Sequence, residues 1–165
     1  MAEAPRRRAV ASWSADERAW YLDLVAQADG RFDTADEPST ALEQYEALPL
    51  DRCILLAGDG DTQLLDVNGD RWSDDRHGRW FQTRSKPLEW LHQRIGRLGL
   101  EEQRAVGRSE VASHICGWCH CIRAEHILYQ PVREDRRDKA YHRVVGRGKI
   151  RPERMPKHLA ISSPM

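Results

Sequence analysis

The stretch that decides the fold of this 165-residue chain is Ser113-His-Ile-Cys-Gly-Trp-Cys-His-Cys-Ile-Arg-Ala-Glu-His-Ile-Leu-Tyr-Gln-Pro-Val-Arg-Glu-Asp135. It contains three of the four cysteines and three of the seven histidines. Thiolate and imidazole groups are the side chains that most often hold zinc in proteins. Their concentration in one short segment predicts that this segment binds a metal ion.

The spacing of these residues favours a four-ligand site. Four residues separate Cys116 from Cys121, and four separate Cys121 from His126. A loop with this spacing can fold back and direct two sulfurs and one imidazole at a single ion, as tetrahedral Zn²⁺ requires. The fourth ligand is either Cys119, which is close in sequence, or Cys53, which would come from a distant strand. In both cases the zinc would be saturated by protein ligands and therefore structural.

The segments on either side of the metal loop predict two strands and a helix. Residues 110–115 form a short apolar and β-branched run, and it carries His114, which the zinc does not need. Residues 126–130 predict a second strand, and Pro131 opens a helix with Glu134 and Asp135 in its first turn. The expected order is strand, metal loop, strand, helix, in a small protein of the α+β class.

This pattern resembles the His-Me finger (ββα-metal) endonucleases, and within them the zinc-bound homing endonucleases of the His-Cys box type. That family carries Ser-His-Leu-Cys, then a Cys and a His at the spacing found here, and then a metal-binding Asn. The matching residues in this chain are Ser113-His114-Ile115-Cys116, Cys121, His126 and Asp135. The match covers about 35 residues and extends more loosely to Cys53, because the fourth zinc ligand of the family comes from an upstream strand.

The resemblance implies two metal sites with different roles. The structural zinc would be bound by Cys53, Cys116, Cys121 and His126. Cys119 is the alternative to Cys53 as the fourth ligand. His114 would be the general base of phosphodiester hydrolysis, and Asp135 would bind a catalytic divalent cation such as Mg²⁺, with Asp138 as the alternative. The family residue at this place is usually Asn, but a carboxylate also offers the hard oxygen that Mg²⁺ prefers. The second, C-terminal zinc site of the family lacks its cysteines here and is not expected.

Length and composition predict one folded unit without a membrane span. Six Trp and 40% hydrophobic residues argue against disorder, although 32% of the residues are charged. No run of about 18 apolar residues is present, and no apolar core follows Arg6–Arg8 as it would in a secretory signal. We therefore expect an intracellular protein, in the cytoplasm or nucleus, whose cysteines are metal ligands or free thiols rather than disulfides.

The charge is balanced overall but unevenly distributed. The chain has 26 basic and 26 acidic residues; from Arg104 onwards there are 13 Lys and Arg against 6 Asp and Glu, which leaves 13 against 20 before it. The basic half is the half that carries the metal motif. This favours a polyanionic partner such as DNA, although a solvated basic helix face would give the same composition.

The chain divides into three segments. Residues 1–48 comprise a basic arm, expected to be mobile over residues 1–12, and a helical segment; residues 49–146 would be the nuclease domain with an upstream β-meander; residues 147–165 would be an extended basic tail. The tail is expected either to wrap a partner subunit, as in a homodimer, or to extend into solvent.

Two helices are predicted in the first segment. Ser14 and Glu17 form a capping box at the start of the first helix. Ser39 or Thr40 caps the second, which runs to about Ala47.

An antiparallel meander is predicted between residues 53 and 84. Its expected strands are residues 53–57, 63–67, a stretch through Trp72, and 80–84, with a turn at Asn68-Gly69. By the resemblance, a ribbon here would lie on DNA, and the candidate nucleic-acid contacts are Arg71, Arg76, Arg79, Arg84, Arg136 and Arg137. Because acidic residues interrupt this run, a plain structural sheet is an equally good interpretation.

An amphipathic helix is predicted from Pro87 to Leu98, with an apolar face of Leu88, Leu91, Ile95 and Leu98. His92 on this helix is expected to be a packing or surface residue.

These observations favour a metal-dependent DNA endonuclease. A non-catalytic zinc module that binds nucleic acid or protein is the alternative, and the neutral net charge would also fit a structural assembly protein with a zinc staple.

Overall fold

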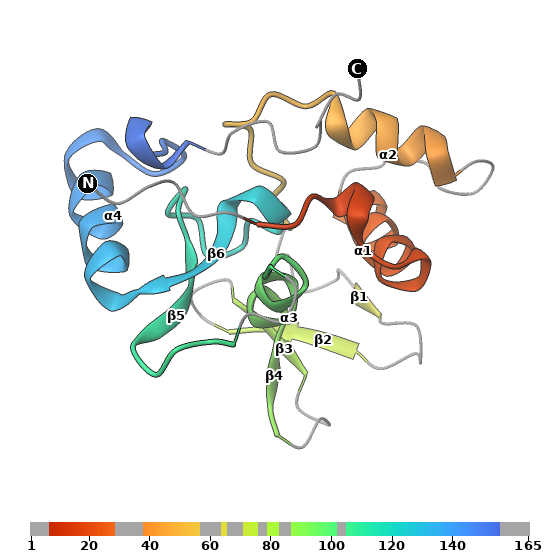
Figure 1. Cartoon of the computed structure of the whole chain (residues 1–165), viewed down its shortest axis with the longest axis horizontal. Coiled ribbons are helices and arrows are strands. Elements are labelled where there is room, and N and C mark those ends of the chain that lie inside the picture. The colour runs from red at the N-terminus through yellow and green to blue at the C-terminus, as the bar shows by residue number, and fades with distance from the viewer. Residues whose placement is uncertain are drawn as a thin grey trace.

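Two antiparallel sheets and four α-helices make up the described part of the chain (Figure 1). The structure is a computed structural model, and it describes residues 7–28, 38–56, 64–65, 71–75, 79–82, 87–101 and 105–155. The predicted α+β class is confirmed.

The first helix forms as the sequence predicts. Helix α1 (Ala15–Ala28) begins after Ser14, whose backbone N–H donates to Glu17 Oε1 at 3.3 Å, while the Glu17 N–H donates to Ser14 Oγ at 3.2 Å. This capping box satisfies two backbone donors that the first turn would leave free. Helix α2 (Pro38–Glu46) begins earlier than expected, so Ser39 and Thr40 lie inside it, because proline is well suited to the first helical position.

The amino-terminal arm is anchored from Arg7 onwards, which corrects the expectation of a mobile segment. Arg7 is buried and donates through Nη1 to the Ile127 carbonyl at 2.8 Å. The Arg8 N–H donates to the Gly99 carbonyl at 2.8 Å, and Val10–Ser12 form a short 3-10 helix. A basic composition alone cannot reveal such contacts, because they are made to backbone far away in the sequence.

A four-stranded sheet follows in the order β1 (Leu64–Leu65), β2 (Arg71–Asp74), β3 (Trp80–Gln82) and β4 (Glu89–Trp90). The predicted strand at residues 53–57 is wrong for its described residues 53–56: only Leu55 makes an isolated bridge, to Cys121. The predicted turn at Asn68-Gly69 lies outside the described residues.

Helix α3 (Leu91–Leu98) begins later than predicted because Glu89 and Trp90 pair with β3 instead of joining the helix. Leu88 therefore precedes the helix and is 46% exposed. Of the rest of the predicted apolar face, Leu91 and Ile95 are buried, and Leu98 is half-buried against the same core.

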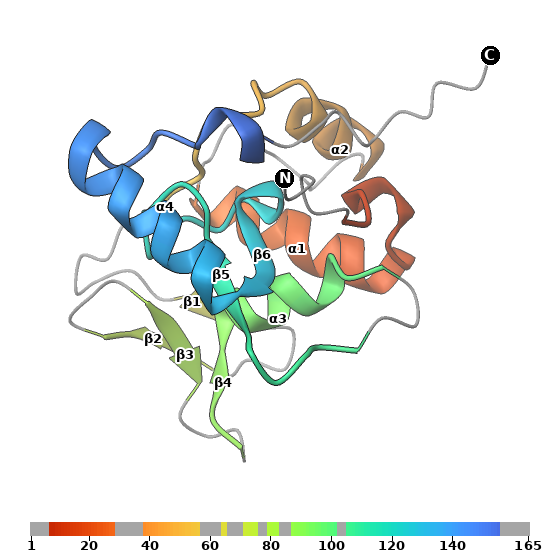
Figure 2. The same cartoon turned by 60° about the vertical axis from the view of Figure 1, so that its left-hand side comes forward.

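The segment around the metal loop confirms the expected elements. Strand β5 (Glu110–His114) pairs with β6 (Ile127–Pro131) so that His114 lies opposite Ile127, and α4 (Val132–Val145) follows directly. In Figures 1 and 2, β5 and β6 lie between α4 on one side and α3 on the other. The motif therefore has helices on both sides.

The segment after α4 folds back onto the helix, whereas an extended tail was predicted. Arg151 donates to Glu134 Oε2 and to Asp138 Oδ1, each at 2.7 Å, and Arg154 donates to Gln130 Oε1. All five side chains are buried. Through Met155 the segment thus packs on its own chain. Residues 156–165 of the predicted tail lie outside the described part, and the homodimer stays a prediction.

Hydrophobic packing occurs in two clusters. The larger joins α1, α2, the four-stranded sheet, α3 and β6 around Tyr21, Trp72 and Ile95. The smaller surrounds Cys116 and Cys121. No helix among the described residues is long and apolar enough to cross a membrane.

The buried ion pairs of Arg151 give a test of this packing. Arg151→Ala should lower the free energy of unfolding by roughly 3 kcal/mol, because two buried carboxylates lose their cation. Urea unfolding followed by tryptophan fluorescence measures this. The hydrogen bond from Arg151 lowers the pKa of Glu134, so its stabilisation is present at neutral pH and decreases as pH falls through that lowered pKa.

Arg137→Ala is the matched control, because Arg137 also pairs with Glu134, at 2.8 Å, but its side chain is 62% exposed. We expect a loss of at most about 0.5 kcal/mol. Equal losses in the two variants would contradict the packing of residues 147–155 on α4.

Candidate metal centre and adjacent cleft

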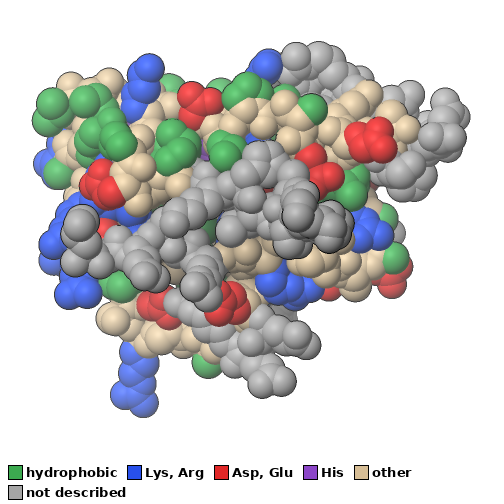
Figure 3. Space-filling model, turned by 45° about the horizontal axis from the view of Figure 1, so that its top comes forward, with side chains coloured by type: hydrophobic (Ala, Val, Ile, Leu, Met, Phe, Trp, Pro, Cys, Tyr) green, Lys and Arg blue, Asp and Glu red, His purple; other side chains and the backbone are tan. Residues whose placement is uncertain are grey.

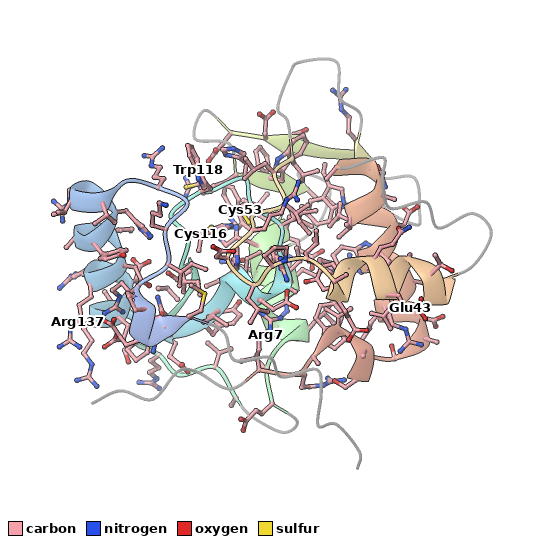
Figure 4. The ribbon with its side chains drawn as sticks, turned by 90° about the horizontal axis from the view of Figure 1, so that it is seen from above. Arg7, Glu43, Cys53, Cys116, Trp118 and Arg137 are labelled. Carbon is pink, nitrogen blue, oxygen red and sulfur yellow. The ribbon has the colours of Figure 1, made fainter. Side chains whose placement is uncertain are left out.

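Three thiols and one imidazole meet at the centre of the molecule. The ligand atoms of Cys53, Cys116, Cys121 and His126 all lie within 4.8 Å of one another. Figure 4 shows Cys53 and Cys116 close together between α4 and the amino-terminal helices. These four residues could hold a metal ion such as zinc, since they match its preferred donor set and number.

Backbone pairing explains why the distant Cys53 belongs to this set. The Leu56 N–H donates to the His120 carbonyl at 3.0 Å, and the Ile122 N–H donates to the Ile54 carbonyl at 2.8 Å. Residues 54–56 therefore run along residues 120–122, and this brings the Cys53 sulfur to the cluster. Cys119 is half-buried and lies outside the four. The cysteine that is close in sequence is not the one that the fold supplies.

The orientation of His126 is fixed by its second nitrogen. Nε2 lies 2.7 Å from the Leu50 carbonyl, and Nδ1 lies 3.6 Å from the Cys53 sulfur and 3.7 Å from the Cys121 sulfur. A carbonyl can only accept, so we assign the ring proton to Nε2. Nδ1 then presents a lone pair to the cluster, as a zinc ligand must.

The closeness of the thiols also favours a cation. Contact with Cys121 and Cys53, together with burial, raises the pKa of the Cys116 thiol. Several thiolates cannot stay charged side by side in a buried place unless a positive charge lies between them. A divalent ion would supply that charge.

The turn of the metal loop depends on a glycine. Gly117 has φ +84°, and its N–H donates to the His114 carbonyl at 3.0 Å. The Gly148 N–H donates to the Cys116 carbonyl at 2.8 Å, and His142 packs directly against Gly117. The loop is thus closed from outside by α4 and the segment that follows it.

Two buried residues that the sequence does not mark as important hold the other side of the loop. Arg123 donates to the Pro49 carbonyl at 2.6 Å and to the Arg52 carbonyl at 3.1 Å. Tyr21 donates to the Ile122 carbonyl at 2.8 Å and accepts from the Ala124 N–H at 2.7 Å. The only sequence signal for these contacts is the presence of an arginine within the apolar run of residues 121–124.

A cleft of about 860 Å³ adjoins the loop on its outer side. His114 and Ser113 line it from the end of β5, and Asp135 lines it from the first turn of α4. The sequence singled out His114 and Asp135 separately, and the fold brings both to one cleft. Cys119 lines it as well.

His114 is neutral in this environment. Burial lowers its pKa to about 4, although charge on Cys121 and a hydrogen bond with the Cys121 backbone act in the opposite direction. Its Nε2 is buried and has no hydrogen-bond partner among the described residues. An imidazole with a free nitrogen at neutral pH can accept a proton.

Asp135 is held at the cleft by short contacts. Ser113 Oγ donates to Asp135 Oδ1 at 2.6 Å, and Lys139 Nζ lies 3.0 Å from Oδ2. Lys139 is 70% exposed, so this ion pair is weak and easily displaced. The predicted alternative, Asp138, is buried outside the cleft lining, where it accepts from Gln130 at 2.7 Å and from Arg151. Asp135 is therefore the carboxylate of the pair that a cation in the cleft could reach.

The arginines predicted to contact nucleic acid differ in their position relative to the cleft. Arg79 lines the cleft, with Nε 2.9 Å from Asp75 Oδ2 and its guanidinium 5.0 Å from the centre of the Trp90 ring. The others that are described are exposed and do not line the cleft: Arg71, Arg136 and Arg137. Arg76 and Arg84 lie outside the described residues.

Further residues line the cleft to which the sequence analysis gave no place in a site: His92, Lys139, His142, Arg143 and Arg147. In Figure 3, Lys and Arg side chains gather at the left edge, where Figure 1 places α4. The acidic residues of α4 are turned inward or towards the cleft, while its basic residues are exposed. The cleft is therefore bordered mainly by positive charge.

Comparisons with protein-family models, with curated proteins and with solved structures give no match for this chain. The resemblance to His-Me finger nucleases stays a prediction from the sequence.

Metal content tests the cluster. Protein purified without chelators should contain about one zinc per chain, because the cluster offers one tetrahedral set. Cys121→Ser and Cys53→Ser should lose the metal and unfold, since a structural zinc contributes directly to folding. Elemental analysis and circular dichroism measure both effects. Cys119→Ser is the matched control and should keep its zinc; the reverse pattern would make Cys119 the ligand.

Gly117 gives a second test. Gly117→Ala should destabilise the zinc-loaded protein more than Gly146→Ala, as measured by urea unfolding. Both glycines have positive φ, +84° and +97°, so both alanines carry roughly 1 kcal/mol of backbone strain. Only at Gly117 would the new Cβ meet another group, His142 Nδ1 at 2.8 Å. Equal losses would show that His142 does not close the loop.

Proposed function

We propose that this protein is a metal-dependent DNA endonuclease of the His-Me finger type, with a structural zinc and one catalytic divalent cation. The observation that carries the proposal is the meeting of His114 and Asp135 in one cleft beside the four-ligand cluster. The two residues come from adjacent elements, β5 and α4, whose relative position the metal loop would fix.

The chemistry requires a base for the attacking water and neutralisation of charge on the phosphate. His114 is suited to the first task, because it is neutral and its Nε2 has no partner among the described residues. It would take one proton from water as the oxygen attacks phosphorus and the bond to the leaving oxygen breaks.

Asp135 is suited to hold the catalytic cation. Its carboxylate offers a hard oxygen at the cleft, and a single protein ligand leaves positions open for water and phosphate. A bound divalent cation would neutralise the phosphate and assist the leaving oxygen. Ser113 keeps the carboxylate in place, and the exposed Lys139 can move aside.

The basic border of the cleft favours DNA as the substrate. Arg79 reaches the cleft from the four-stranded sheet, while Lys139, Arg143 and Arg147 lie on the α4 side. A phosphodiester backbone entering between them would be contacted from both walls. A centre with three thiol ligands also needs a reducing environment, which agrees with the expected intracellular location.

One observation favours a non-catalytic zinc module instead. Asp135 is already paired with Lys139 at 3.0 Å, an arrangement that needs no cation. In such a module the cluster would stabilise the fold, and the basic border would bind a partner without cleavage.

Variants of the cleft residues separate the two functions. His114→Ala should lower cleavage of supercoiled plasmid with Mg²⁺ by roughly 10²–10⁴-fold while zinc content stays unchanged. Asp135→Ala should also lose activity, but raised Mn²⁺ should restore part of it, because this variant loses cation affinity rather than the base.

His120→Ala is the control, because His120 lies on the same loop and packs on Trp118 outside the cleft lining. It should cleave like the wild type. A wild-type protein that binds DNA but never cuts it with any divalent metal would establish the non-catalytic module instead.

A further inference from the structure

The solvent-facing side of α4 and of the residues directly after it carries one sign of charge. The acidic residues of this helix are not exposed: Glu134 and Asp138 are buried, and Asp135 is half-buried at the cleft. Figure 4 shows side chains that end in nitrogen extending outward from α4 around the labelled Arg137. The basic residues between positions 132 and 147 are all exposed: Arg133, Arg136, Arg137, Lys139, Arg143 and Arg147.

Two of these cations are compensated by acids of their own helix. Arg137 Nη1 lies 2.8 Å from Glu134 Oε1, and Lys139 Nζ lies 3.0 Å from Asp135 Oδ2. Both pairs have the spacing of three or four residues that brings side chains together on a helix. The positive charge of Arg137 and Lys139 is therefore partly used within the protein.

Arg136 and Arg143 differ from them in this respect. Neither has an acidic residue three or four positions away, and neither has an ion pair among the described residues. The charged neighbours of Arg136 at this spacing are Arg133 and Lys139, and those of Arg143 are Lys139 and Arg147. Like charges at this spacing destabilise a helix. Anionic groups lying against Arg136 and Arg143 would remove this repulsion.

The two arginines also share one face of the helix. They are seven residues apart, so two turns of α4 separate them by about 10 Å along the axis. Arg143 lines the cleft, whereas Arg136 lies outside its lining. The positive border of the cleft thus continues along the outer face of α4. Arg137 follows Arg136 directly and is rotated by about 100° around the helix axis, which turns it further from the cleft.

We propose that Arg136 and Arg143 bind the phosphate backbone of a DNA duplex where it leaves the cleft. Phosphates of one strand follow one another at about 3.4 Å along the duplex axis, so the two arginines span about three of them. A guanidinium group binds phosphate oxygens through two parallel N–H groups and needs no contact with a base. The choice of DNA as the occupant rests on the proposed function, because the charge of this face alone would attract any polyanion.

The salt dependence of DNA binding tests the contact at Arg136. The full-length, zinc-loaded protein is titrated with a labelled DNA duplex, without an added divalent cation, and fluorescence anisotropy is recorded over a series of KCl concentrations. Arg136→Gln should weaken binding and reduce the slope of log K against log salt concentration by about one, since each neutralised phosphate contributes roughly 0.9 to it. The loss should be equal for two duplexes of unrelated sequence, because phosphates carry no sequence information.

Arg137→Gln is the matched control, because it removes the same charge from the adjacent position of the same helix. It should leave the slope unchanged. No binding by the wild type, an unchanged slope in Arg136→Gln, or an equal decrease in both variants would overturn the proposal. Stronger competition by an RNA duplex or by polyglutamate than by unlabelled DNA would identify a different occupant and would overturn it as well.

Cleavage kinetics separate this inference from the proposed function. Because Arg136 would contact the backbone away from the reacting phosphate, Arg136→Gln should raise KM for DNA cleavage and leave kcat unchanged. A wild type that binds DNA through Arg136 but never cuts it would refute only the nuclease. A wild type that cuts DNA, together with Arg136→Gln and Arg137→Gln variants that bind it alike, would refute only the contact on α4.

Discussion

The fold depends on one electrostatic constraint: three thiols and an imidazole must share a space less than 5 Å across. Without a cation the thiolates would repel one another, and with one they would connect the two halves of the chain. Cys53 belongs to the amino-terminal half, while its three partners lie between Cys116 and His126. The same loop is also held by Tyr21 of α1 and by Arg123, which reaches the carbonyls of residues 49 and 52. The amino-terminal part of the chain therefore helps to support the candidate metal centre.

The acidic side chains of helix α4 are divided between its buried face and the cleft. Glu134 and Asp138 face inward and are neutralised by Arg151, whereas Asp135, between them in sequence, reaches the cleft. If residues 147–155 did not fold back, two buried carboxylates would have to find water, and the first turn of α4 would lose its fixed position. The C-terminal segment thus contributes to the cleft indirectly. It neutralises Glu134 and Asp138, the acids that the helix buries, and leaves to Ser113 and Lys139 the contacts of Asp135, the acid that would bind a cation in the proposed function.

The sequence predicted what depends on local spacing. The positions of Cys116, Cys121 and His126, the two strands and the helix after them, and the capping box of Ser14 and Glu17 all follow from residues a few places apart. It could not decide between Cys53 and Cys119, because that choice depends on backbone pairing between residues 54–56 and 120–122. The start of α3 was missed for a similar reason: Glu89 and Trp90 have a strand partner that the helical pattern does not reveal. Contacts of Arg7, Arg151 and Arg154 were missed because a charged side chain is expected to be exposed unless its distant partner is known.

Several buried nitrogen atoms of the described residues lack a hydrogen-bond partner, and three of them belong to the region of His114. Buried polar groups such as those of Arg123 and Gln130 have protein partners, whereas Trp80 Nε1, His92 Nδ1 and His114 Nε2, like Arg7 Nη2 and Trp13 Nε1, have none within the described part of the chain. A fold selected for stability alone would fill such a place with apolar side chains, because each partnerless nitrogen is destabilising. Departures of this kind tend to occur where a site must present reactive groups. Burial lowers the pKa of His114, and the residue also lines the cleft. In the proposed function, the role of this imidazole as a base would account for its place there, in spite of the cost of burying a partnerless nitrogen.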